Sequence, residues 1–241
     1  MASSADIGRR LDAVRDRIAR AAGRAGRNPA AVRLVAISKT FTAEHVRAAA
    51  AAGQVDFGEN KVQEGLQKIA QTSDLEIRWH LVGHLQSNKA RKAGAQFDLI
   101  HSVDDAPLVT RLDEAALAAG RRVDLLVQVD LAGEATKYGA REEALAPMFD
   151  AARDCRAARL VGLMLLPPAV DDPEQARPYF RALRALRDRL IDLGIDRAML
   201  AELSMGMSHD FEAAVEEGAT LVRVGTAIFG ERARPQESAH L

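Results

Sequence analysis

Lys39 is the residue of this chain whose type and position most directly indicate chemistry. It follows the apolar run 32–38 and precedes a helical stretch. An unpaired ammonium group at the tip of a buried strand costs free energy, so such a lysine is expected to have a carboxylate partner, a phosphate ligand or a covalent task. For an amine, the covalent task is Schiff-base formation with a carbonyl compound. The residues around Lys39 leave these three alternatives open.

Two turns of small residues, at 203–208 and 222–227, indicate a phosphate site. Each follows a predicted strand and leads into a predicted helix, and such turns expose backbone N–H groups that bind phosphate. Either turn alone is explained by the need for small residues in a tight strand-to-helix connection. The two together, with Arg223 in the second, favour a phosphate ligand.

A Schiff-base lysine and a phosphate site in one cavity indicate pyridoxal 5'-phosphate (PLP). The aldehyde of PLP would bond to Lys39. Its phosphate would rest on Ser204, Gly225 and Thr226. PLP is therefore the cofactor that these residues predict.

A class I aldolase that acts on a phosphorylated sugar is the alternative ligand chemistry. It also uses a lysine in a barrel, but it normally needs a general acid or base beside that lysine. Glu59 follows a predicted strand and Asp130 ends another, and they are the candidates for that role. The sequence alone leaves this alternative open.

The elements that must position these residues alternate between strands and helices along the whole chain. The strands are predicted near 32–38, 54–58, 77–82, 97–101, 123–130, 159–166, 200–204 and 220–225. Eight such units in about 250 residues match a single (β/α)8 TIM barrel, whose active groups lie at the carboxyl ends of the strands. A doubly wound open sheet is the competing α/β fold, because alternation does not show closure.

Three helices are predicted from apolar spacing and end signals. An extra N-terminal helix carries Ile7, Leu11, Val14 and Ile18 on one face, a second spans 173–193, and a third runs from an N-cap at Ser208 to Gly218. No Pro- or Gly-rich linker divides the chain. We therefore expect one PLP-binding domain over residues 1–241, with a barrel core at about 30–234.

Composition restricts the function classes and the compartment. The formal net charge is -1 over 241 residues, which argues against nucleic-acid binding. Cys155 is the single cysteine, so no disulfide forms within the chain. There is no signal-peptide pattern and no apolar run long enough to cross a bilayer. We expect a cytoplasmic protein without a membrane or nucleic-acid partner.

Beyond these features, the chain resembles the YggS/PROSC family of PLP homeostasis proteins, which are similar to the N-terminal domain of alanine racemase. The matching stretches are Leu34–Thr40, Phe57–Asn60 with Gln63 and Glu64, Trp79–Lys89, Gly162–Met164, Leu203–Ser208 with Asp210, and Val222–Gly230. The resemblance implies a barrel that holds PLP as a Schiff base on Lys39. It further implies phosphate contacts from Ser204, Met205, Gly225 and Thr226, and positions beside the cofactor for Asn60 and Arg223. Tyr138 and Leu165–Leu166 depart from the family pattern on the substrate side.

The resemblance also bears on turnover. An arginine at the pyridine nitrogen would disfavour its protonation and weaken carbanion stabilisation, and Arg223 is expected either there or at the phosphate. Related racemases take a catalytic tyrosine from a second domain, for which this sequence leaves no room after the eighth unit. We therefore expect a PLP carrier or buffer that supplies PLP-dependent apoenzymes. A low-activity amino-acid racemase is the alternative, and no metal is expected.

Overall fold

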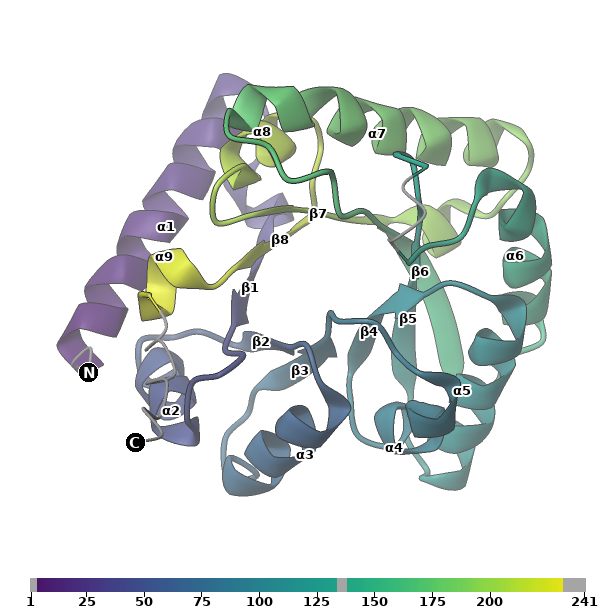
Figure 1. The fold of residues 1–241 in the computed structure, drawn as a ribbon, viewed down its shortest axis with the longest axis horizontal. Helices are drawn as coiled ribbons and strands as arrows, with labels where there is room; N and C mark the ends of the chain where they lie inside the picture. The colour runs from purple at the N-terminus through teal and green to yellow at the C-terminus, as the bar shows by residue number, and fades with distance from the viewer. Residues whose placement is uncertain (1–3, 134–137, 232–241) are drawn as a thin grey trace, which may run out of the picture.

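A closed barrel of eight parallel strands forms the centre of the protein (Figure 1). The structure, a computed structural model, describes residues 4–133 and 138–231. Each strand pairs with the next in sequence order, and β8 returns to β1 with Val35 beside Arg223. This closure excludes the open sheet and confirms the predicted (β/α)8 barrel. The strands are β1 Arg33–Ile37, β2 Asp56–Glu59, β3 Arg78–Leu81, β4 Leu99–Val103, β5 Val123–Gln128, β6 Ala158–Met164, β7 Glu202–Met207 and β8 Leu221–Val224.

Helices surround the barrel, and the predicted N-terminal helix is among them. This helix, α1, lies outside β8 and β1 and packs on α2, α8 and α9. It covers a part of the barrel where the last helix, α9, has only one turn. The helices are α1 Ser4–Arg24, α2 Ala43–Ala51, α3 Val62–Gln71, α4 Ala90–Gly94, α5 Ala106–Ala118, α6 Leu145–Arg153, α7 Arg177–Asp192, α8 Phe211–Glu216 and α9 Thr226–Phe229. The expected end of the barrel core at residue 234 lies outside the described residues. Among the described helices, none has the length and apolar composition needed to cross a membrane.

The core has two parts because the strands are buried on both faces, as in other parallel sheets. Most buried apolar residues lie between the strands and the surrounding helices. A smaller apolar cluster faces the barrel interior and consists of Val35, Ile37, Val82, Leu99, Leu126, Met164 and Leu221. The interior also holds buried polar side chains, which the functional site uses.

Strand β7 runs three residues beyond its predicted end at 204. The register between β7 and β8 shifts between Ser204 and Met207, and Gly206 has a φ of 91°. A Cβ on Gly206 would lie 2.5 Å from that of Ala214, so the close approach of α8 requires glycine. The small residues that indicated a turn therefore lie inside an irregular strand.

Helix α8 begins at Phe211, so the predicted N-cap at Ser208 is wrong. The N-cap residue is Asp210, whose carboxylate accepts a hydrogen bond from the backbone of Met207 at 2.6 Å instead of capping the helix. This bond closes the loop between β7 and α8. Ser208 is thereby left in the loop, near the end of the barrel.

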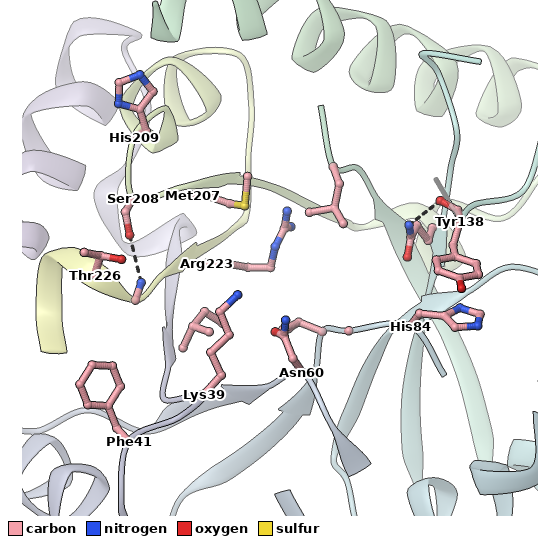
Figure 2. A pocket seen from close by; sticks show the side chains of 16 residues that line it. Lys39, Phe41, Asn60, His84, Tyr138, Met207, Ser208, His209, Arg223 and Thr226 are labelled. Atoms are coloured by element: carbon pink, nitrogen blue, oxygen red, sulfur yellow. Dashed lines mark hydrogen bonds between the residues drawn. The ribbon is translucent and has the colours of Figure 1, made fainter. Parts of the chain in front are cut away.

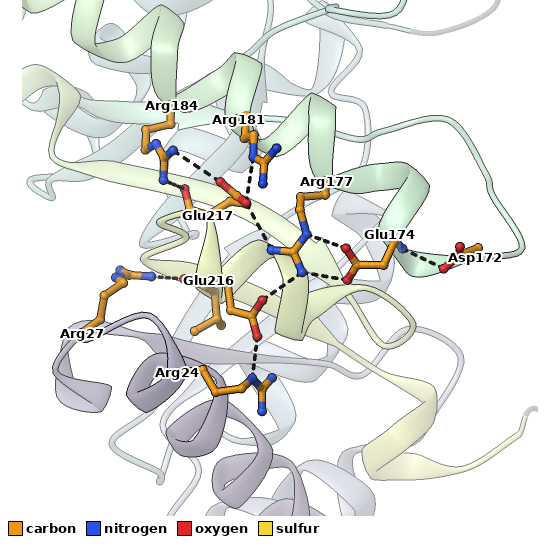
Figure 3. Close-up of polar contacts among 10 residues, drawn as sticks. Arg24, Arg27, Asp172, Glu174, Arg177, Arg181, Arg184, Glu216 and Glu217 are labelled. Atoms are coloured by element: carbon orange, nitrogen blue, oxygen red, sulfur yellow. Dashed lines mark hydrogen bonds and ion pairs between the residues drawn. The ribbon is translucent and has the colours of Figure 1, made fainter.

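An ion-pair network joins α7 to the end of α8 (Figure 3). The side chain of Glu217 is only 7% exposed and accepts contacts from Arg177 at 3.1 Å, Arg181 at 2.9 Å and Arg184 at 3.3 Å. Glu216 contacts Arg177 and an arginine of α1. Because Glu217 is enclosed by three cations, it should contribute more to stability than an exposed ion pair does.

Replacement of Glu217 by Gln should therefore lower the free energy of unfolding by about 1–3 kcal/mol. Glu174→Gln is the matched control, because Glu174 also contacts Arg177 but is 60% exposed, and it should change stability by less than about 0.5 kcal/mol. Urea denaturation measures both. Equal effects of the two substitutions would show that enclosure of Glu217 adds nothing.

Candidate functional site

A cavity of about 610 Å³ opens at the carboxyl ends of the strands (Figure 2). This is the end of the barrel at which the polar residues were predicted to gather. The lining residues are Ile37, Lys39, Phe41, Asn60, Val82, Gly83, His84, Gln128, Tyr138, Leu166, Met207, Ser208, His209, Arg223, Gly225 and Thr226.

Lys39 enters the cavity from the turn between β1 and α2, and its side chain extends toward Arg223 and Asn60 (Figure 2). The next residue, Thr40, has a φ of 71°, in the left-handed region that costs free energy for a residue with a side chain. The backbone N–H of Thr40 donates to a carboxylate oxygen of Glu64 at 2.6 Å. This bond offsets part of the strain and fixes the turn that presents Lys39.

A buried ionic cluster supports the same turn. The ammonium of Lys68 in α3 donates to Glu59 at 2.6 Å, to Glu64 at 2.9 Å and to the backbone oxygen of Ser38 at 2.8 Å. The hydroxyl of Ser38 donates to the same oxygen of Glu59 at 2.6 Å. Burial raises the pKa of Glu59, and its other oxygen has no hydrogen-bond partner among the described residues. Lys68 thus connects Ser38, the residue before Lys39, to the carboxylate of Glu64. That carboxylate in turn binds Thr40, the residue after Lys39.

Hydroxyl and backbone N–H groups line the opposite side of the cavity. The backbone N–H of Gly225 donates to the hydroxyl of Ser208 at 3.1 Å, so the hydroxyl proton can be donated to a ligand. Thr226 follows at the start of α9, where the first N–H groups of a helix have no acceptor within the helix. Ser208 and Thr226 therefore supply donors suited to an anionic oxygen group, and Gly225 orients the hydroxyl of Ser208.

Arg223 lies at the centre of the cavity and is only 4% exposed. One terminal nitrogen donates to the hydroxyl of Ser204 at 2.6 Å, and the other to the backbone oxygen of Leu165 at 2.9 Å. Burial lowers the pKa of Arg223 to about 10, which leaves the guanidinium protonated at neutral pH. Two basic side chains, Lys39 from the turn after β1 and Arg223 from the adjacent strand β8, therefore share one cavity.

The structure brings five of the seven predicted site residues to the cavity, namely Lys39, Asn60, Arg223, Gly225 and Thr226. Ser204 and Met205 do not line it. Ser204 lies within β7, fully buried, between Arg223 and His101, and Met205 is fully buried in the core outside the barrel. Because β7 extends to Met207, the positions expected for them are taken by Met207 and Ser208.

The side of the cavity farthest from Ser208 is formed by residues that sequence reasoning did not assign to the site. The rings of His84 and Tyr138 stack with centroids 3.5 Å apart and planes at 8°. Gln128 donates to the backbone oxygen of Tyr138 at 2.6 Å and holds this wall in place. His84 follows the third strand and Gln128 ends the fifth, and that placement was the available signal.

The two carboxylates considered for an aldolase do not line the cavity. Glu59 is engaged by Lys68 and Ser38, and Asp130 accepts from the backbone of Ala132 and Gly133. In the part of the chain that the structure describes, no group of three or more His, Cys, Asp or Glu side chains could hold a metal ion. The chemistry of the cavity rests on an amine, a guanidinium, hydroxyls and the imidazoles of His84 and His209.

Comparison with known proteins places the chain in a family. Residues 10–233 match the family model described as alanine racemase, N-terminal domain. Proteins named pyridoxal phosphate homeostasis protein are 43% identical over 223 residues in Aquifex aeolicus and 44% identical over 227 residues in Pseudomonas aeruginosa. The alignments cover 92% and 94% of this chain, and 97% and 96% of those proteins.

Solved structures agree with the sequence comparison. PipY of Synechococcus elongatus, known with and without bound PLP, is 40% identical with a TM-score of 0.82, over 93% of this chain and 100% of that one. An alanine racemase of Clostridium difficile is 14% identical with a TM-score of 0.69, over 95% of this chain and 58% of that one, and shows a common fold alone. The chain belongs to the family of the alanine racemase N-terminal domain and, within it, groups with the pyridoxal phosphate homeostasis proteins.

Proposed function

We propose that this protein binds PLP as a Schiff base on Lys39 and acts as a carrier or buffer in intracellular PLP homeostasis. The observation that carries the proposal is the cavity that Lys39 and Arg223 share with the donors of Ser208 and Thr226. The family relatives named for PLP homeostasis, and the PipY structure with PLP bound, support it. We further propose that residues 1–241 form one PLP-binding domain with its barrel core at about 30–234.

The residues present fit PLP. Two cations in a partly enclosed cavity favour an anionic ligand, because an opposite charge offsets both their repulsion and their desolvation. Ser208 and Thr226 would hold the phosphate, with Gly225 orienting the Ser208 hydroxyl beside it, and Asn60 and Arg223 would contact the ring. When bound, PLP supplies an aldehyde that reacts reversibly with amines and a ring that can withdraw electrons.

Lys39 performs the covalent step in this proposal. Its neutral amine would condense with the aldehyde, forming a C=N bond with loss of water. Arg223 lines the same cavity, and a guanidinium near an amine disfavours the protonated form of that amine by like-charge repulsion. Release reverses the step by addition of water, so the same lysine can take up and deliver PLP.

The proposal extends to the compartment and the partners of the protein. We propose a cytoplasmic protein whose recipients are PLP-dependent apoenzymes, with neither a membrane nor a nucleic acid as partner. The proposal of a protein recipient is supported by the mouth of the cavity, where Tyr138 is 57% exposed and Met207 is 38% exposed. Apolar groups at the mouth give a recipient protein a surface to contact while PLP leaves.

A low-activity amino-acid racemase is the second candidate, and Tyr138 is the observation that favours it. Racemisation needs one acid or base on each face of the substrate. Tyr138 lines the same cavity as Lys39 and stacks on His84. It is therefore the one tyrosine among the described residues in a position to serve as a second group.

Borohydride reduction of the PLP-loaded protein, followed by peptide mapping, should place the label on Lys39. Lys39→Ala should abolish the label and the absorbance of the bound cofactor, because Lys39 is the one lysine among the described residues that line the cavity. Lys61→Ala is the matched control, since Lys61 is an exposed lysine next to Asn60 and should label as the unaltered protein does. A label on another lysine, or no label after loading, would overturn the assignment.

The Lys68 cluster should set both stability and PLP affinity. Lys68→Met leaves the buried Glu59 without its cation and should lower the free energy of unfolding by about 3–5 kcal/mol. The double variant Lys68→Met/Glu59→Gln should recover much of this loss, as measured by urea denaturation. Its PLP affinity should stay weakened, because Ser38 and Thr40 lose their shared support. If the double variant bound PLP like the unaltered protein, the cluster would not position Lys39.

Turnover should be slow, and any turnover should depend on Tyr138. Incubation with L-amino acids in deuterated water, followed by NMR, measures exchange of the α-proton. We expect exchange far below enzyme-like rates of about 1–1000 per second. Tyr138→Phe keeps the stacked ring and removes the hydroxyl, so a further decrease would identify Tyr138 as the second acid or base. Exchange at an enzyme-like rate would refute the carrier role.

A further inference from the structure

A continuous line of hydrogen bonds crosses the inside of the barrel and ends at Arg223. From the carboxylate of Asp56 to the Nε2 of His80 is 2.9 Å, and from the Nδ1 of His80 to the Nε2 of His101 is 3.0 Å. The Nδ1 of His101 lies 2.8 Å from the hydroxyl of Ser204, which Arg223 contacts at 2.6 Å. We call this set the interior chain; its members are Asp56, His80, His101, Ser204 and Arg223.

The interior chain spans the length of the barrel. Asp56 is the first residue of β2 and borders a second cavity at the amino ends of β1 and β2, whereas Arg223 lines the candidate PLP cavity at the carboxyl ends. The five residues come from five different strands, and none is more than 6% exposed. Buried polar groups of this kind are stable only when hydrogen-bonded, so the bonds between them are a requirement of the fold.

The chemistry of the two ends fixes the direction of the bonds. A guanidinium can only donate and an ionised carboxylate can only accept. Arg223 therefore donates to Ser204, whose own proton goes to the Nδ1 of His101. His101 donates from Nε2 to His80, and His80 donates from Nε2 to Asp56. Each ring is then neutral and carries its proton on Nε2, and every donor and acceptor in the series has a partner.

The opposite direction leaves groups unsatisfied. If His80 carried two protons, His101 would have to donate from Nδ1 to Ser204, which already accepts from Arg223. The hydroxyl proton of Ser204 would then need another acceptor, and none is observed among the described residues. Burial lowers the pKa of His101 well below its usual value, and the charge of Arg223 acts in the same direction. A protonated His101 in the same barrel interior as Arg223 is thus unfavourable.

We propose that the interior chain is a one-way series of hydrogen bonds that fixes the guanidinium of Arg223 at the cavity, and that its other four members are positioning residues. The hydroxyl of Ser204 is committed within the series and is not a phosphate ligand. That task is left to Ser208, in the loop after β7. The proposal rests on the proposed function only for the identity of the ligand as PLP.

The direction of the series can be read without any ligand. Nitrogen NMR of the full-length protein, with 15N-labelled histidine, reports the protonation of each ring nitrogen, and single His80→Gln and His101→Gln variants assign the signals. At pH 7.5 we expect both rings to be neutral with the proton on Nε2. A doubly protonated His80, or a proton on the Nδ1 of His101, would overturn the proposal.

The positioning role is tested at Asp56, the end of the interior chain that does not line the candidate PLP cavity. Asp56→Ala should shift the ring signals of both histidines and weaken PLP binding by about tenfold, the value expected for loss of one hydrogen bond to a charged group. Ser204→Ala should weaken binding by at least as much. Arg78→Gln is the matched control, because Arg78 contacts the other oxygen of Asp56 at 2.8 Å from outside the series, and it should leave the affinity within twofold.

The outcomes separate this proposal from the proposed function. Unchanged PLP affinity in a folded Asp56→Ala variant would refute the positioning role while PLP binding stood. Failure of the unaltered protein to bind PLP would refute the proposed function, and the histidine tautomers would still report the direction of the series. If Asp56→Ala does not fold, the histidine tautomers of the unaltered protein and the PLP affinity of Ser204→Ala decide whether the proposal stands.

Discussion

Two positive charges in one cavity are the constraint on which the rest of the structure depends. Lys39 lies in the turn after β1 and Arg223 lies in β8, and these two strands are neighbours in the closed barrel. Like charges at close range in a partly enclosed site repel, and burial removes the water that would screen them. The protein must therefore hold both side chains in place by other contacts until an anion arrives. The interior chain and the Lys68 cluster serve this requirement.

The two cations are supported from opposite faces of the sheet. Successive residues of a strand point to opposite faces, so a barrel can separate one set of supports from the other. Arg223 is held from the inside, through Ser204 and the histidines behind it. The turn that carries Lys39 is held by Lys68 of α3, which covers the outer face. Because the supports do not overlap, the position of the amine and that of the guanidinium are set independently.

The sequence was sufficient for the barrel and for most of the cationic site. The strands were predictable because they are continuous apolar runs, and Lys39 and Arg223 stood out because each is a cation beside such a run. Ser204 was assigned to the phosphate because its neighbours are small. The strand in fact continues through Gly206, and only the structure shows the positive φ and the register shift that make this possible.

Contacts between distant strands could not be read from the sequence. His80 and His101 belong to strands that look ordinary by themselves, and nothing in their local sequence indicates that Ser204 lies behind them. The order of the series depends on barrel closure, which sets strands β2 to β4 across from β7 and β8. The stacking of Tyr138 on His84 depends in the same way on two loops that meet only in the folded protein.

The charges in the cavity also help to explain how a barrel like that of the racemases would act as a PLP carrier. Catalysis on an amino acid needs a group that withdraws electrons from the substrate and acid or base groups that move a proton on both of its faces. In this cavity the buried cation Arg223 opposes protonation of any nearby ring nitrogen, and Tyr138 lies at the exposed rim. Reversible capture of an aldehyde needs neither of these catalytic features. It needs an amine of fixed position, donors for a phosphate and an open mouth, and the described residues supply these three.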